Sequence, residues 1–162
     1  MKKQKSIGNK GFSLVELIIV IAIMAILVGV MAPQLLRYVE RTRISADTQV
    51  ADSVKTAITT AMLDPAVISA DTPGIPGTLP ATLNLATAAN FTGAFGDAVA
   101  QTLGYASVAA MTDTDTGIVS ELQSNGATGI TAVIDATGNR VTVTITGSHA
   151  DGTDDGAPIV VE

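Results

Sequence analysis

KGFSLVELIIVIAIMAILVGVMAP, residues 10–33, decides the fold of this chain because it is long and apolar enough to cross a lipid bilayer. Between Leu14 and Ala32 the only charged side chain is that of Glu16. These 19 residues would form a helix about 28 Å long at about 1.5 Å per residue, close to the thickness of a bilayer core. An ionised carboxylate in hydrocarbon is strongly unfavourable unless it is neutralised or paired. Glu16 therefore needs a partner, which a simple membrane anchor does not provide.

The helical pattern continues beyond this run and becomes amphipathic from Gln34 onward. Pro33 lies inside it and should kink or loosen the helix, because proline lacks a backbone N–H. Asp64-Pro65 ends it, since the residue before a proline is pushed out of the α-helical region. The expected helix therefore runs from Phe12 to Leu63. Its apolar face is assigned Leu36, Val39, Val50, Val54, Ala57, Ile58, Ala61 and Met62, and its charged face Arg37, Glu40, Arg41, Asp47, Asp52 and Lys55.

Residues 64–162 are expected to form a soluble head built on a small antiparallel sheet. Prolines and glycines predict a long loop over residues 64–93, and residues 94–103 predict a short helix. Residues 131–136 and 140–146 flank a turn at residues 137–139, and in the second arm valine and isoleucine alternate with threonine, which is typical of a β-hairpin. Residues 158–161 could add a last strand. A long helix packed on a small antiparallel sheet is an α+β fold.

Charge and composition exclude several classes of function. Beyond Met62 a single arginine stands against eleven carboxylates, and so acidic a surface repels phosphate backbones, so no direct nucleic-acid binding is expected. The chain has no cysteine, which excludes a disulfide, a thiolate metal site and a cysteine nucleophile. Aromatic residues are only 3% of the chain, so the core is expected to consist of Ala, Val, Ile and Leu. No phosphate-binding glycine loop or catalytic pair is evident, and we expect no enzyme.

The N-terminus carries Lys2, Lys3, Lys5 and Lys10 with no acid among them. By the positive-inside rule these lysines place the N-terminus in the cytoplasm and the head outside. A cleaved secretory signal peptide would be cut after Ala32, but Pro33 is a poor residue to follow the cut. An uncleaved signal anchor explains neither Glu16 nor the Gly11-Phe12 junction.

The segment KGFSLVE, residues 10–16, resembles the processing site of type IV pilins and of the pseudopilins of type II secretion and competence systems. The shared features are a short basic leader ending in glycine, a phenylalanine, a glutamate at the fifth position after the cut, and an apolar helix. Pro33 also falls where that family places its helix-loosening proline. The resemblance covers the chain up to the Asp64-Pro65 break. It implies cleavage after Gly11 by a prepilin peptidase, N-methylation of Phe12, and polymerisation into a helical filament.

This family divides the chain into four parts: a cleaved leader, residues 1–11; a hydrophobic transmembrane and assembly helix, residues 12–33; an amphipathic half of that helix, residues 34–63; and the head, residues 64–162. The resemblance also implies that the Glu16 carboxylate meets the N-terminal amine of Phe12 of a neighbouring subunit inside the filament. A paired charge is tolerated in an apolar bundle, whereas loss of one partner leaves the other uncompensated. The alternative is a hydrated, idle carboxylate at the membrane interface.

Asp151, Asp154 and Asp155 lie within DGTDDG, residues 151–156. Clustered carboxylates are suitable ligands for calcium, and major pseudopilins carry a calcium site in their C-terminal loop region. The spacing is not that of an EF-hand, and a solvated turn is the alternative. No cofactor is otherwise expected, and calcium is the one possibility for which the sequence offers ligands.

The expected function is that of a structural subunit, a major pilin, which polymerises from a membrane pool into a cell-surface type IV pilus. Its expected partners are other copies of the chain, the prepilin peptidase, the pilus assembly machinery and, before assembly, the membrane. A pseudopilin of a secretion or competence system is the alternative, favoured by DGTDDG. A membrane-anchored binding module remains open if the leader stays attached.

Overall fold

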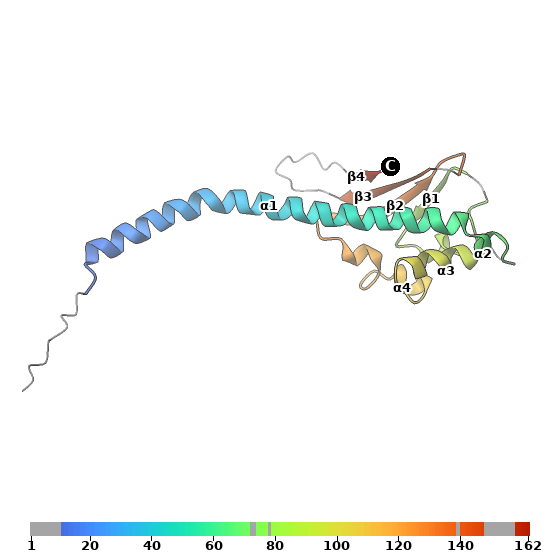
Figure 1. Ribbon diagram of the computed structural model, residues 1–162, viewed down its shortest axis with the longest axis horizontal. Helices are drawn as coiled ribbons and strands as arrows, with labels where there is room; N and C mark the ends of the chain where they lie inside the picture. The colour runs from blue at the N-terminus through green and yellow to red at the C-terminus, as the bar shows by residue number, and fades with distance from the viewer. Residues whose placement is uncertain (1–10, 72–73, 78, 139, 148–157) are drawn as a thin grey trace, which may run out of the picture. The chain divides into compact units, whose positions relative to one another are not determined.

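The computed structural model describes residues 11–71, 74–77, 79–138, 140–147 and 158–162. The chain forms two compact units, Met1–Leu36 and Arg37–Glu162. The described part of the first unit is a short segment without regular secondary structure, residues 11–13, and the beginning of helix α1, Leu14–Leu63. The second unit contains the rest of α1 and a four-stranded antiparallel sheet (Figure 1). The α+β fold predicted from the sequence, a long helix packed on a small antiparallel sheet, is confirmed.

Helix α1 begins at Leu14 rather than at Phe12, because Ser13 caps its first turn. Pro33 lies inside α1, and the chain is helical on both sides of it. The helix ends at Leu63, as predicted, because Asp64 has the extended backbone that a following proline favours. The Asp64 carboxylate accepts a hydrogen bond of 2.8 Å from the Ala66 N–H and so caps the short helix α2, Pro65–Ile68.

The sheet consists of β1 (Ala81–Asn84), β2 (Ala127–Ile134), β3 (Val141–Gly147) and β4 (Ile159–Val161), each paired with the next along the chain. The predicted hairpin is present as β2 and β3, although β2 begins and ends earlier than expected. Its turn is closed by a hydrogen bond of 2.9 Å from the Asp135 N–H to the Arg140 carbonyl. The predicted last strand is β4, which pairs with β3 from Val143 to Ile145.

The chain end after β4 is held by two basic side chains from different elements. Lys55 of α1 donates a hydrogen bond of 2.5 Å from its Nζ to the Glu162 carbonyl oxygen. Arg140 pairs with the Glu162 carboxylate at 3.7 Å. Both cations are therefore engaged within the chain.

The prediction of an uninterrupted loop over residues 64–93 is wrong. Besides α2, this segment contains β1 and the 3-10 helix η1, Ala88–Asn90. Strand β1 has only four residues, and it exists because it pairs with β2, Leu83 lying opposite Ala132. Leu83 is buried, so the strand is stabilised by a tertiary contact that no local pattern reveals.

Three short helices complete the head. The predicted helix at residues 94–103 is present as α3, Gly93–Thr102, and is followed by α4, Val108–Met111, and the 3-10 helix η2, Ile118–Glu121. The polar run between α4 and η2 is a turn held by Asp113, whose carboxylate accepts from the N–H groups of Asp115 and Thr116 and from the Thr116 hydroxyl. These hydrogen bonds hold the pKa of Asp113 below its ordinary value.

The core lies between the second half of α1, the sheet and helix α3. In the view of Figure 1, the strands lie on one side of this part of α1 and α3 and α4 on the other. Burying a side chain such as Ile58 contributes about 1.5–3 kcal/mol. The core members are Ala51, Val54, Ala57, Ile58 and Ala61 of α1; Leu83, Ile130, Ala132, Ile134, Val141, Val143 and Ile145 of the sheet; and Val67, Leu85, Phe91, Phe95, Val99, Ala100, Met111 and Ile118 of the connecting segments.

The expectation that the core consists of Ala, Val, Ile and Leu is incomplete. Phe91 and Phe95 are both buried, and their rings are nearly parallel with centroids 6.2 Å apart. Met111 is also fully buried. These three buried side chains lie in or beside α3 and α4, and each aromatic ring fills more volume than an aliphatic side chain would.

Gly96 lets α3 pack closely against the backbone of Phe91, which precedes the helix. A Cβ at this position would lie 2.5 Å from both the carbonyl carbon and the carbonyl oxygen of Phe91. We expect Gly96→Ala to lower the free energy of unfolding by about 1–3 kcal/mol, because this overlap outweighs the helix propensity of about 1 kcal/mol that alanine gains over glycine.

The measurement is urea unfolding of the full chain in detergent, followed by circular dichroism. Gly77→Ala is the matched control, since a Cβ there meets no atom within 4 Å. Equal unfolding midpoints for the two variants would show that the Phe91 backbone moves aside at no cost.

Candidate functional site

The predicted processing site lies in an accessible segment. Gly11 and Phe12 precede α1 and belong to no helix or strand, and Phe12 is 91% exposed. A Cβ added to Gly11 would have no neighbour within 4 Å. A protease needs accessible, non-helical backbone on either side of the bond it cuts, and this junction has both properties.

Ser13 and Glu16 form a capping box at the start of α1. The Ser13 N–H donates to Glu16 Oε2 at 2.8 Å, and the Val15 N–H donates to Ser13 Oγ at 3.3 Å. These bonds satisfy backbone donors that have no partner inside the helix. The resemblance implies a partner for Glu16 in another subunit. The structure shows a further, local partner within the same turn.

The first part of α1 exposes its apolar side chains all round. From Leu14 to Leu36 no side chain is buried, and Leu14, Ile26 and Leu36 are each more than 60% exposed. Among the described residues α1 is the one helix that is long and apolar enough to cross a membrane, judged by length and composition. An apolar surface of this extent marks a site of contact with lipid or with other protein chains.

Two carboxylates in the second half of α1 are buried, contrary to their assignment to the exposed charged face. Asp47 is 0% exposed and Glu40 is 6% exposed. They lie seven residues apart, two helical turns, and so share the face that continues into Val54 and Ile58. Burial of a carboxylate is unfavourable unless hydrogen bonds replace its water, so the partners of these groups decide their role.

The partners are three successive backbone N–H groups in the segment between η2 and β2. Gln123 N–H donates to Asp47 Oδ1 at 2.7 Å, and Ser124 N–H donates to Asp47 Oδ2 at 3.0 Å. The Ser124 hydroxyl also donates to Asp47 Oδ2. Asn125 N–H donates to Glu40 Oε1 at 2.7 Å. We call Glu40, Asp47 and the backbone of residues 123–125 the helix–loop clamp.

The helix–loop clamp explains why the assignment of Glu40 and Asp47 was wrong. Hydrogen bonds to an ionised acceptor contribute about 1.5–3 kcal/mol each, more than those between neutral groups. They also satisfy N–H groups that belong to no strand. The available signal was the spacing: Asp47 stands one turn before Ala51 on the apolar face, a position where a solvated carboxylate is out of place.

A second polar contact joins the connecting segments of the head. The Tyr105 hydroxyl donates to Glu121 Oε1 at 2.5 Å. Partial burial of Tyr105, and then this bond to a carboxylate, raise the pKa of the phenol well above its ordinary value. The phenol therefore stays protonated and acts as a structural donor.

The predicted calcium ligands Asp151, Asp154 and Asp155 lie outside the described residues, and calcium binding stays a prediction. Within the described ranges, no three His, Asp or Glu side chains are grouped so that they could hold a metal ion.

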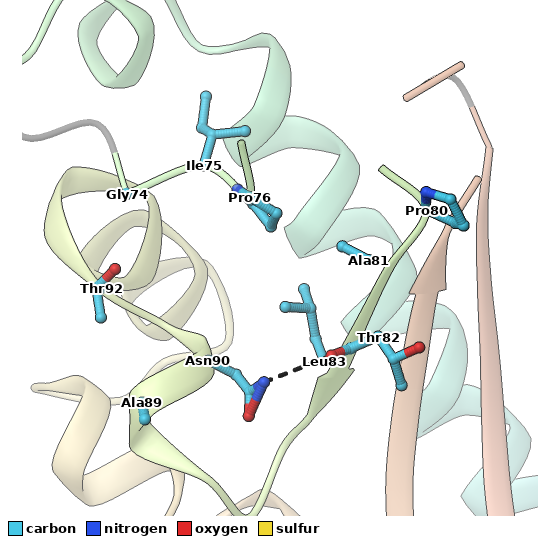
Figure 2. A pocket seen from close by; sticks show the side chains of 10 residues that line it. All are labelled: Gly74, Ile75, Pro76, Pro80, Ala81, Thr82, Leu83, Ala89, Asn90 and Thr92. Carbon is cyan, nitrogen blue, oxygen red and sulfur yellow. Dashed lines mark hydrogen bonds between the residues drawn. The ribbon is translucent and has the colours of Figure 1, made fainter. Parts of the chain in front are cut away.

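A pocket of about 500 Å³ lies beside β1. Figure 2 shows its lining, which carries no charged side chain. Asn90 Nδ2 donates across it to the Thr82 carbonyl at 3.4 Å. None of these side chains can act as a general acid or base, so the residues that line the pocket do not support acid–base catalysis. Its lining residues are Gly74, Ile75, Pro76, Pro80, Ala81, Thr82, Leu83, Ala89, Asn90 and Thr92.

The N-terminal segment matches a known family model, described as the prokaryotic N-terminal methylation motif, over residues 8–32. The matched stretch contains the Gly11-Phe12 junction, the capping box and most of the exposed apolar run. The resemblance to the type IV pilin and pseudopilin family is therefore confirmed for this N-terminal segment.

Among characterised proteins, the chain is similar to fimbrial subunits. A Dichelobacter nodosus protein named Type IV major fimbrial protein FimA is 42% identical over 56 residues, which are 35% of this chain and 36% of that protein. A Moraxella nonliquefaciens protein named Fimbrial protein is 45% identical over 53 residues, 33% of this chain and 34% of that protein. The chain thus spans about a third of the length of the curated relatives it matches. No solved structure matches it.

The helix–loop clamp generates a test of stability. In Asp47→Asn the amide presents two donors to a site that supplies three, so at least one buried N–H or O–H loses its acceptor. We expect the free energy of unfolding to fall by about 3 kcal/mol.

Urea unfolding of the full chain in detergent measures this loss, and hydrogen exchange at residues 123–125 should accelerate in parallel. Asp52→Asn is the control, because Asp52 is on the same helix but exposed, and its change should stay within about 0.5 kcal/mol. Equal stability of the two variants would contradict the clamp.

Proposed function

We propose that this chain is the major structural subunit of a type IV pilus, and not an enzyme. The observation that carries the proposal is the methylation motif at residues 8–32, which continues into an apolar helix with no buried side chain up to Leu36. Such a helix has to be covered, first by lipid and then by other copies of itself. The names of the similar proteins, both fimbrial, support the same function.

The proposed sequence of events begins in the cytoplasmic membrane with the N-terminus inside. A prepilin peptidase hydrolyses the Gly11-Phe12 bond, which releases residues 1–11 and leaves a new amine on Phe12 that is then methylated. The pilus assembly machinery extracts the apolar helix into a helical homopolymer on the cell surface. Pro33 loosens the helix during this step. The accessible, non-helical backbone at Gly11 and Phe12 supports the first step.

Glu16 has two roles in this proposal. In the single chain its carboxylate caps α1 through the Ser13 N–H. In the filament the same carboxylate meets the positively charged amine of Phe12 of a neighbouring copy, which fixes the axial register of helices that would otherwise slide. A carboxylate can accept both bonds, because its two oxygens offer about four lone-pair sites.

A pseudopilin of a type II secretion or competence system is the second candidate. The feature that favours it is the acidic DGTDDG segment, whose Asp151, Asp154 and Asp155 would bind calcium. Such a protein shares the processing step but forms a short polymer that stays at the cell envelope.

Intact-mass spectrometry of material sheared from native cells tests the function first. We expect a dominant species that starts at Phe12 and is one methyl group heavier than the unmodified chain. Processed protein found only in the membrane fraction would favour the pseudopilin. A chain that still carries residues 1–11 would overturn both candidates.

Glu16→Gln separates the two proposed roles of Glu16. Glutamine still accepts a hydrogen bond from the Ser13 N–H, so the cap survives, but its charge is gone. We expect normal processing and no filaments, because an uncompensated amine at a buried contact costs about 3–5 kcal/mol per subunit. The readouts are the mass of the membrane-bound subunit and the yield of sheared filaments, with Ser13→Ala as the control that weakens only the cap. Abundant Glu16→Gln filaments would refute the charge pairing.

A further inference from the structure

The basic side chains of the Arg37–Glu162 unit fall into two groups. Lys55 and Arg140 both bind Glu162 and are engaged within the chain. The other three, Arg37, Arg41 and Arg43, lie within seven residues of α1. We call these three residues the arginine band.

The arginine band is largely available to a partner. Arg37 and Arg41 are exposed, and neither forms an ion pair with any residue that the structure describes. They lie four residues apart and so project from one face of the helix. Arg43 is 48% exposed at its side chain and contacts Glu40 at 3.6 Å, but Glu40 is already bound by the Asn125 N–H.

The rest of the unit presents the opposite charge. Asp52, Asp97, Asp115 and Glu121 are all exposed, and beyond Met62 eleven carboxylates face a single arginine. Removal of residues 1–11 would also remove four lysines, which leaves five basic against fifteen acidic side chains in the mature chain. Copies of such a chain repel one another at close range unless cationic and anionic surfaces meet.

The position of the arginine band is also unfavourable for membrane insertion. Positive residues just beyond an apolar span oppose the bias that keeps basic flanks in the cytoplasm. Neutral polar residues would avoid this conflict and would solubilise the helix equally well. The three arginines therefore need a function that outweighs their unfavourable effect on membrane insertion.

We propose that the arginine band docks on the acidic surface of a second copy of this chain. This inference rests on the proposed function, because the second copy is the neighbouring subunit of the filament. Charge complementarity within one sequence favours this occupant, since every added copy brings both the band and the acidic surface. The contact lies beyond the apolar first part of α1. It adds an electrostatic contribution to the stability of the filament and to the register of its subunits.

Arg37→Gln/Arg41→Gln tests the inference, with Arg37→Lys/Arg41→Lys as the matched control that keeps the charge. Both are made in the full chain in native cells. We expect equal amounts of processed subunit in the membrane, at least a tenfold lower yield of sheared filaments for the glutamine variant, and near wild-type yield for the lysine variant.

The salt response of purified filaments gives a second readout. The Debye length falls from about 10 Å at 0.1 M salt to about 3 Å at 1 M, so wild-type filaments should release subunits faster as NaCl rises over this range. Filaments of the glutamine variant should release subunits at a rate that does not depend on NaCl.

Wild-type filament yield with unchanged salt response in the glutamine variant would overturn the inference. A fall in membrane-bound processed subunit that matches the fall in filaments would also overturn it, because the arginines would then act on lipid headgroups. The absence of sheared, processed filaments from wild-type cells would instead remove the proposed function itself.

Discussion

The hydrogen bonds that Asp47 accepts from residues 123 and 124 are the interaction on which the head of this protein depends. A long helix that packs through alanines and valines makes a narrow contact, with Ala51, Val54 and Ala57 buried in the core. Burial of an alanine side chain contributes less free energy than burial of a larger apolar side chain, because it removes less area from water. Asp47 and Glu40 add directional, charge-assisted bonds at the end of this contact nearest Arg37, and they fix the chain that leads into β2.

Local signals predicted the N-terminal part of this protein well. The processing motif, the apolar run and the proline that ends α1 each act through neighbouring residues, so sequence alone locates them. Strand β1 and the burial of Glu40 and Asp47 could not be predicted in this way. Their partners are about 50 and about 80 positions away in the chain, and a four-residue strand or a helix carboxylate becomes stable only when tertiary contacts bring those partners near.

Two positions along α1 use carboxylates in related ways. Glu16 binds a backbone N–H in its own first turn, and Asp47 binds backbone N–H groups of a distant segment. In both places the partner is main chain rather than a basic side chain. A carboxylate on the helix therefore accepts hydrogen bonds from backbone N–H groups that have no partner in regular secondary structure. Backbone N–H groups that are shielded from water generally need such an acceptor. Phe91 and Phe95 are the aromatic members of a core that is otherwise built from aliphatic side chains and Met111.

At Gln123 and Asn125 the helix–loop clamp binds only the backbone N–H groups, so the side chains at these two positions can vary. The side chains of Gln123 and Asn125 take no part in the bonds that hold their segment, and both residues are exposed. Any amino acid with a backbone N–H would be held in the same way, and proline alone would not. The outward side chains of this segment can therefore change while the backbone that carries them stays in place.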